Sequence, residues 1–251
     1  CEYQDLEYPD DCIVDFDMRL IDLFKEMDKK KLTLKMQIRQ EYYRVKELLD
    51  GKRPSRMDLF TYMDDDIYRC CVSGSHAKEN PFQHYLDFLY ELGELSEDEQ
   101  ELYAGIGREF IQTIETTEMQ KVYKMPILYS FYNHGNIRLE VTDEEVLESW
   151  KEFFDTGTNW KDFPNVNTYE DYKKVTDKQH LSKAKRMPIT RLKMSGKGFF
   201  VEKDGYALAL RDEIGDVVGN MAFGEQMGDV LGYRSLEYYR RRYKKNRSEV
   251  D

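Results

Sequence analysis

Apolar residues recur at intervals of three and four along most of this 251-residue chain, and capping patterns precede several of these runs. Such spacing places the apolar side chains on one face of an α-helix. Two capping boxes, Ser96 with Glu99 and Thr142 with Glu145, supply the side chains that satisfy the first free amides of a helix. The sequence therefore predicts a mainly α protein, and aromatic residues, 14% of the chain, are large enough to fill its core.

Turn and cap residues set the expected ends of these helices. Gly51 ends one helix because glycine tolerates left-handed backbone. Ser55 with Asp58 begins the next, and Pro81 suits the first position of another. Pro126 must begin or kink its helix because it lacks an amide hydrogen. The expected helical ranges are about 16–29, 34–49, 55–60, 81–114, 127–131, 142–154 and 223–243.

The order helix, strand, helix is expected between Glu118 and about Phe154. Residues 137–141 alternate like a strand, between a turn at 133–136 and the helix capped by Thr142. This order is compatible with a winged-helix or helix-turn-helix core, and it is also common in other small α folds. Residues 155–182 are polar and poor in aliphatic side chains, which is typical of a connector.

A β-hairpin is expected in the last third of the chain. Asp204-Gly205 lies between two β-prone runs, and a two-residue turn of this type needs positive φ at both positions. The predicted fold is thus mainly α with a small β-hairpin, a helical bundle followed by a winged-helix-like unit. The predicted regions are 1–117, a helical region, 118–163, the winged-helix-like unit, and 164–251, a basic connector with the hairpin and the C-terminal helix.

Positive charge is concentrated in two stretches of an acidic chain, whose 38 Lys and Arg against 49 Asp and Glu give a net charge of −11. The balance excludes a uniformly basic nucleic-acid binder. Residues 173–197 and 240–247 are basic, and tyrosines interleave the second stretch. These cations have two interpretations. They form a solvated helix end, where positive charge interacts favourably with the helix dipole at the C-terminus, or they bind nucleic acid, with the tyrosines stacking on bases. The candidate nucleic-acid-binding residues are Lys183, Lys185, Arg186, Arg191, Lys193, Lys197, Arg240, Arg241, Arg242, Lys244 and Lys245.

Negative charge gathers on the helix that begins at Ser96. An exposed acidic face there should repel phosphate and suits solvent or a basic protein surface. It motivates an alternative function, a protein-interaction module of a bacterial defence or mobile-element system. The residues of this face are Glu94, Glu97, Asp98, Glu99 and Glu101.

Catalytic motifs are missing from the sequence. Residues 195–198, Ser-Gly-Lys-Gly, lack the spacing of a phosphate-binding loop. Glu202 and Lys203 are adjacent on a predicted strand, so they point to opposite faces and do not form the pair of metal-dependent nucleases. The four histidines form neither an HxxxH pair nor a triad motif. We expect this segment not to be an enzyme and to hold no cofactor.

Cysteine and aspartate clusters have two interpretations each. Cys1, Cys12, Cys70 and Cys71 are expected to be reduced thiols. A zinc site using Cys70 and Cys71 with a histidine is the alternative, although adjacent cysteines do not match zinc-ligand spacing. The run 64–66, three aspartates, is expected to cap the next helix, and a cation site is its alternative.

Three stretches resemble the region downstream of the motor in bacterial superfamily 2 (DEAD/DEAH-type) helicases. Residues 114–128 read IETTEMQKVYKMPIL, where the family commonly has an acidic residue, Thr, a small residue and Met, then Lys-Ser-Tyr-Lys-Met-Pro and aliphatics. Glu118, Gln120 and Val122 depart from that pattern. Residues 51–59, GKRPSRMDL, are similar to the family's Gly-Arg-x-Pro-Thr helix start, and 12–17, CIVDFD, to the exit from the second RecA-like lobe.

The resemblance implies a helical, non-catalytic C-terminal accessory region that follows the RecA-like lobes, supports them and contacts DNA or RNA. ATP and Mg²⁺ would bind the parent motor, whose ATPase residues would lie upstream, so no catalytic residue is carried over. The first residue, Cys1, fits this expectation of a piece of a longer protein. No signal segment and no apolar run near 20 residues is present, so we expect a cytoplasmic protein without a membrane partner.

Overall fold

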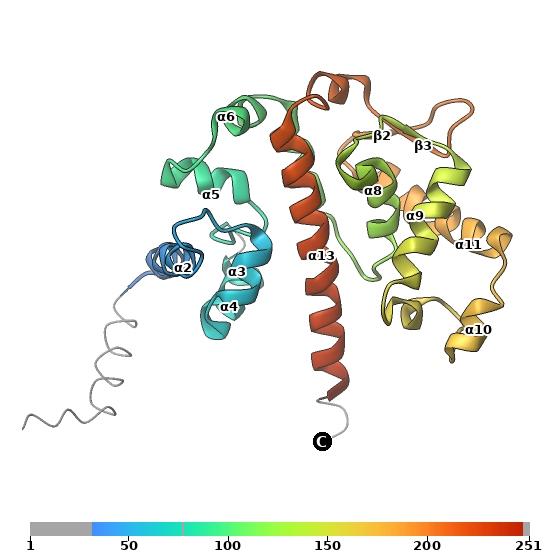
Figure 1. The fold of residues 1–251 in the computed structure, drawn as a ribbon, viewed down its shortest axis with the longest axis horizontal. Helices are drawn as coiled ribbons and strands as arrows, with labels where there is room; N and C mark the ends of the chain where they lie inside the picture. The colour runs from blue at the N-terminus through green and yellow to red at the C-terminus, as the bar shows by residue number, and fades with distance from the viewer. Residues whose placement is uncertain (1–31, 77, 248–251) are drawn as a thin grey trace, which may run out of the picture.

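The computed structural model of the chain describes residues 32–76 and 78–247 and shows a mainly helical protein (Figure 1). The predicted helix at 16–29 lies outside these residues. The elements of the first half are α2 (Leu34–Leu48), α3 (Arg56–Tyr62), α4 (Asp65–Cys71), the 3-10 turn η1 (Gly74–His76), α5 (Tyr85–Leu92), α6 (Glu97–Ala104) and α7 (Ile106–Thr116).

The second half contains shorter helices, a small sheet and one long terminal helix. These elements are α8 (Lys124–Tyr132), η2 (Asn133–Gly135), β1 (Glu140–Val141), α9 (Asp143–Asp155), η3 (Asn159–Asp162), α10 (Tyr169–Lys173), α11 (Asp177–Ala184), the π-helix η4 (Lys185–Ile189), α12 (Thr190–Ser195), β2 (Phe200–Val201), β3 (Leu208–Leu210), η5 (Asp212–Asp216) and α13 (Met221–Arg247).

Helix α13 stands between two lobes (Figure 1). The first lobe, α2–α5, has its own apolar core, to which α13 contributes Tyr233. The second lobe, α8–β3, shares a larger core with α6 and α7, to which α13 contributes residues such as Phe223, Met227 and Leu231. Because one helix supplies side chains to both cores, it fixes the position of each lobe relative to the other.

A buried ion network ties this helix to the first lobe. The guanidinium of Arg56, which is 0% exposed, donates to Glu115 at 2.5 and 3.0 Å, to Gln226 at 2.7 Å and to Asp229 at 2.8 Å. Asp229 also accepts from the backbone amides of Arg56 and Met57, so it caps α3 from α13. A buried cation is stable only when such partners replace its lost hydration.

The network continues through Gln226 to a second ion pair. Gln226 donates to Glu99 at 2.7 Å, and Glu99 also accepts from Arg53. Burial opposes ionisation of Glu99, but the hydrogen bond from Arg53 prevails and lowers the pKa of this carboxyl. The helices α3, α6, α7 and α13 therefore meet at alternating charges rather than at apolar side chains alone.

Most helix ends fall where the cap residues predict them. The capping boxes of Ser55, Ser96 and Thr142 are all formed, and Gly51 has a φ of 80°. Pro126 lies in the first turn of α8, as expected. The start predicted at Pro81 is wrong. Residues 80–83 form a turn in which the side chain of Asn80 accepts from the Phe82 amide, and α5 begins only at Tyr85.

The sheet is antiparallel with the strand order β1-β3-β2. The predicted hairpin joins β2 to β3, and Asp204-Gly205 occupies the two central positions of its turn, because the Tyr206 amide donates to the Lys203 carbonyl. The expected positive φ at both positions is wrong, since only Gly205 has positive φ, 87°. The third strand, β1, comes from the helix–strand–helix stretch and pairs with β3 through Glu140–Ala209 and Val141–Leu208.

The predicted connector at 155–182 is in fact packed. It contains η3, α10 and part of α11, and aromatic side chains replace the missing aliphatic ones. Phe163, Tyr172 and His180 are each at most 5% exposed, and the centres of their rings lie 4.9 to 5.7 Å apart. Across 32–76 and 78–247, no helix is both long and apolar enough to cross a bilayer.

Removing the buried cation tests the role of the network. We expect Arg56→Met, which keeps much of the side-chain volume, to lower the free energy of unfolding by about 3–5 kcal/mol because Glu115 and Asp229 lose their buried partner. Arg69→Ala removes an exposed pair with Asp66 and should cost less than about 1 kcal/mol. Urea denaturation of both variants measures the difference. Equal losses would contradict this role.

Candidate functional site

The first group of candidate residues lies on one continuous helical segment. α11, η4 and α12 follow one another without a break from Asp177 to Ser195, and Pro188 lies inside the π-helical turn. Ala184, Ile189 and Leu192 face the core. The candidates Lys183, Lys185, Arg186, Arg191 and Lys193 belong to this segment, and Lys197 follows it directly.

Four of these six cations have no ion-pair partner within the described ranges. Lys185 binds both carboxylate oxygens of Asp143, at 2.8 and 2.9 Å, and Lys193 pairs with Glu202. The other four are half-buried or exposed. We call them the cationic ridge, and it comprises Lys183, Arg186, Arg191 and Lys197.

The arginines of the second group of candidates form ion pairs within the molecule. Arg240 pairs with Asp65 and lies 4.9 Å from the ring centres of Phe60 and Tyr68. Arg241 pairs with Glu237 at 2.5 Å, and Arg242 pairs with Asp162 at 2.7 Å. These arginines therefore join α13 to both lobes or to itself. The side chains of Lys244 and Lys245 lie outside the described part of the structure.

The tyrosines of this stretch contact other parts of the molecule, and their stacking on bases stays a prediction. Tyr238 is 5% exposed and belongs to the larger core. Tyr239 stacks on Tyr243, with ring centres 6.3 Å apart, and the Tyr243 hydroxyl lies 2.9 Å from that of Thr158. The pattern of alternating tyrosine and arginine thus reflects helix packing, because α13 continues to lie against the second lobe here.

Asp162 explains why Arg242 is held in place. Its side chain is 1% exposed, and burial raises its pKa, a rise that Arg242 and Lys121 oppose. The Asp162 backbone carbonyl accepts from the Tyr123 hydroxyl at 2.6 Å. Arg242 therefore neutralises a buried carboxylate, and a phosphate would have to compete with Asp162 for this guanidinium.

The prediction that the acidic residues at 94–101 form an exposed face is wrong for two of them. Glu99 is 1% exposed because it folds over the N-terminus of α6 toward Arg53. Glu94 is half-buried and accepts from Lys46 at 2.7 Å. The exposed members are Glu97, Asp98 and Glu101.

Cys70, Cys71 and the three aspartates lie in α4 or at its N-terminus, whereas Cys1 and Cys12 lie outside the described residues. Asp64 accepts from the Asp66 and Ile67 amides, which confirms the helix cap. Cys70 is exposed, whereas Cys71 is buried, and burial raises the pKa of its thiol to about 12. In the described portion of the chain, no three His, Cys, Asp or Glu side chains are grouped to hold a metal ion.

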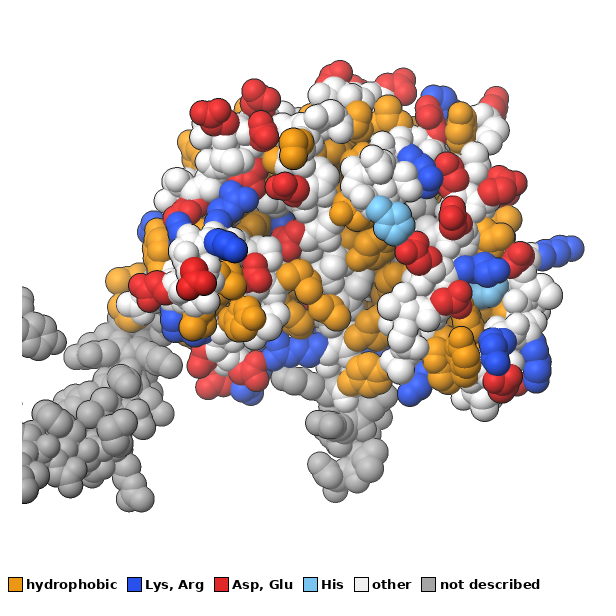
Figure 2. Space-filling model, viewed as in Figure 1, with side chains coloured by type: hydrophobic (Ala, Val, Ile, Leu, Met, Phe, Trp, Pro, Cys, Tyr) orange, Lys and Arg blue, Asp and Glu red, His pale blue; other side chains and the backbone are white. Residues whose placement is uncertain are grey.

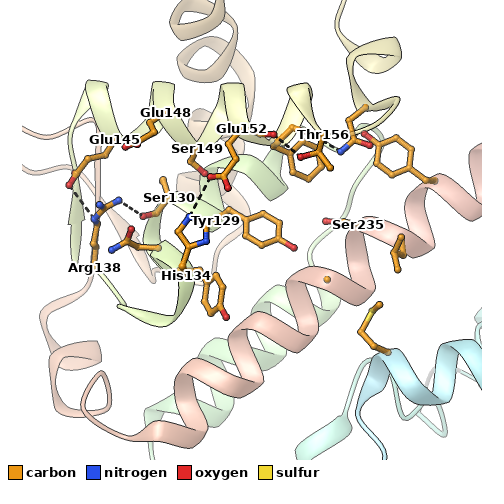
Figure 3. Close-up of a pocket in the computed structure, with 18 residues that line it drawn as sticks. Tyr129, Ser130, His134, Arg138, Glu145, Glu148, Ser149, Glu152, Thr156 and Ser235 are labelled. Carbon is orange, nitrogen blue, oxygen red and sulfur yellow. Dashed lines mark hydrogen bonds and ion pairs between the residues drawn. The ribbon is translucent and has the colours of Figure 1, made fainter.

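A groove between α9 and α13 was not predicted from the sequence. It has a volume of about 550 Å³, and α8, which packs on both helices, contributes Tyr129 and Tyr132 to its floor. Figure 3 shows Tyr129 between α9 and α13. α9 supplies Glu145, Glu148 and Glu152 to one wall, as Figure 3 shows. These glutamates were visible in the sequence on the exposed side of a predicted helix, but the facing wall comes from α13, which no local pattern could place there.

An arginine compensates one of the three glutamates, and a histidine lies beside another. Arg138 lies 3.2 Å from Glu145 and also donates to the Ser130 carbonyl at 3.3 Å, and the His134 Nε2 atom is 3.5 Å from Glu152 (Figure 3). Glu148 is exposed and has no ion pair in the residues that the structure describes. The groove thus combines an aromatic floor with a carboxylate rim.

No protein-family model, curated protein or solved structure matches this chain. The resemblance to helicase C-terminal regions stays a prediction.

Neutralising Arg242 tests whether this arginine is structural. We expect Arg242→Gln to lower the free energy of unfolding by about 1–3 kcal/mol at neutral pH, because Asp162 stays buried without its cation. Because the pKa of Asp162 is raised in the folded state, a falling pH protonates this carboxyl in the folded protein before it does so in the unfolded chain. The loss of unfolding free energy in Arg242→Gln should therefore shrink as the pH falls toward about 4.

Arg69→Gln is the control, since its side chain and that of its partner Asp66 are both exposed. Thermal unfolding across this pH range compares the two variants. A loss for Arg242→Gln that is independent of pH, or no larger than that of the control, would contradict the assignment.

Proposed function

We propose that this chain is a non-catalytic accessory region of an ATP-dependent nucleic-acid motor, and that its cationic ridge binds DNA. The observation that carries the proposal is the ridge itself. Three cations on one helical segment, and Lys197 directly after it, have no ion-pair partner among the described residues, in a chain whose net charge is −11. Cations in this state release counterions from a phosphate backbone when they bind it.

The arrangement of the second lobe supports this proposal. α9 packs against α8 and α11, and α8 also contacts η4, which makes a three-helix core. Together with the strand order β1-β3-β2, the succession α8, β1, α9, α11–α12, β2, β3 fits a winged-helix unit. In this proposal the unit runs from α8 to β3, beyond the end predicted at 163, and the turn at 203–206 is its wing.

The ridge then occupies the position of a recognition helix. Helix-turn-helix proteins place this helix in the major groove of DNA, where its polar side chains meet bases and phosphates. The major groove of an RNA duplex is too deep and narrow for such a helix. The proposal therefore favours duplex DNA. The ATP and Mg²⁺ of the motor, and its RecA-like lobes, would belong to the rest of the polypeptide.

A protein-interaction module remains the second candidate function. The acidic face at 94–101 supports it less than predicted, because Glu94 and Glu99 are used inside the molecule. The groove between α9 and α13 supports it independently, since its carboxylates and aromatic floor are unsuited to phosphate.

Binding of a fluorescein-labelled DNA duplex over a range of salt concentrations tests the proposal. We expect Arg186→Gln/Arg191→Gln to weaken binding by about tenfold and to reduce the slope of log affinity against log salt by about 1.8, which is 0.9 for each lost phosphate contact. Arg39→Gln/Lys52→Gln removes two exposed cations of the first lobe and should change neither quantity.

Two results would contradict the proposal. One is the absence of duplex binding at low salt. The other is an equal salt slope for the ridge variant and the control variant.

A further inference from the structure

The groove between α9 and α13 is shaped to receive a helix. Its α9 wall consists of residues at positions 145, 148, 149, 152, 153 and 156, the spacing of one helix face, and its α13 wall of positions 232, 235, 236 and 239. Both walls pack on α8, which lies between them as the floor. Two helix faces that flank a third leave the position that another helix fills in a bundle.

The length of the α9 wall sets the size of the occupant. From Glu145 to Thr156 the wall covers about 16 Å, at about 1.5 Å per residue. An occupying helix would therefore make about three turns in the groove. The volume of about 550 Å³ is within the usual range of binding clefts, about 300–1,000 Å³.

The surface of the groove is apolar at its base and acidic on one side. Leu236 is 46% exposed here, and the rings of Tyr129, Tyr132 and Phe153 surround the base. Figure 2 shows hydrophobic side chains along the hollow beside α13 and acidic side chains on the lobe to its right. Among the lining residues, the basic side chains are Arg138 and the titratable His134.

We infer that this groove binds an amphipathic helix of a partner protein, with aliphatic side chains on the aromatic floor and Lys or Arg side chains against α9. The charges select this occupant. Glu148 is uncompensated in the described structure, and a lysine or arginine from the partner would pair with it and compete with His134 for Glu152. Helix-in-groove binding of this kind uses apolar anchors spaced at i, i+3 or i+4 and i+7.

The site does not use the cationic ridge, so a failure of DNA binding leaves it untouched. Most of its residues come from α8, α9 and α13, and none of its lining residues belongs to the ridge, which runs from α11 to Lys197 just after α12. The ridge variant Arg186→Gln/Arg191→Gln should accordingly bind a peptide as the unchanged protein does.

A designed peptide is the probe. It is a fluorescent helix of about fourteen residues with leucines at i, i+3 and i+7 and lysines along one flank, and its partner peptide carries glutamates in place of the lysines. We expect the lysine peptide to bind with a micromolar dissociation constant, and the glutamate peptide to bind at least about tenfold more weakly.

Variants locate the binding. Glu148→Gln/Glu152→Gln should weaken binding of the lysine peptide by about three- to tenfold. Glu144→Gln, on the same helix but outside the groove, should leave this binding unchanged. Leu236→Asn should weaken both peptides, with Leu48→Asn, 58% exposed on α2, as its control. Circular dichroism of each variant verifies that it is folded.

The inference is overturned if the lysine peptide fails to bind. It is also overturned if the groove variants bind as their controls do, or if the two peptides bind equally.

Discussion

The buried guanidinium of Arg56 is the interaction on which the rest of the structure depends. It binds the buried Glu115 of α7 and the largely buried Asp229 of α13, and its own side chain is 0% exposed, so three helices are held at fixed positions by a charge that must be neutralised. Asp229 completes the N-terminus of α3 at the same time. Apolar packing allows helices to slide, whereas these directed hydrogen bonds specify one register between α13 and the first lobe.

Both candidate sites follow from the position of α13. Its Phe223 and Met227 enter the larger core, which also holds α8 and the sheet, and this arrangement leaves α11–α12 free to present cations outward. Lower on the same helix, Leu236 and Tyr239 face α9 across the groove. Gly228 makes room for the Tyr132 ring, because a Cβ atom there would lie 2.5 Å from the Tyr132 hydroxyl.

Local sequence signals predicted the helices well and the sites only in part. Ser96, Thr142 and Asp64 mark helix starts because a cap depends on a few neighbouring residues. The pairing of Arg56 with Asp229 joins positions 173 residues apart, which no local pattern contains. For the same reason the sequence could group the ridge cations in one basic stretch but could not show that this stretch is helical, that Arg242 neutralises Asp162, or that α13 faces α9.

The central claim is that α13 makes the two lobes one cooperative unit. Native-state hydrogen exchange measures it most directly, because it reports the free energy of opening for each helix. The account predicts that the most protected amides of α2 and of α9 exchange with the same free energy and lose protection together as denaturant is added. Earlier opening of α2 while α9 stays protected would show that the lobes unfold separately and would contradict the claim.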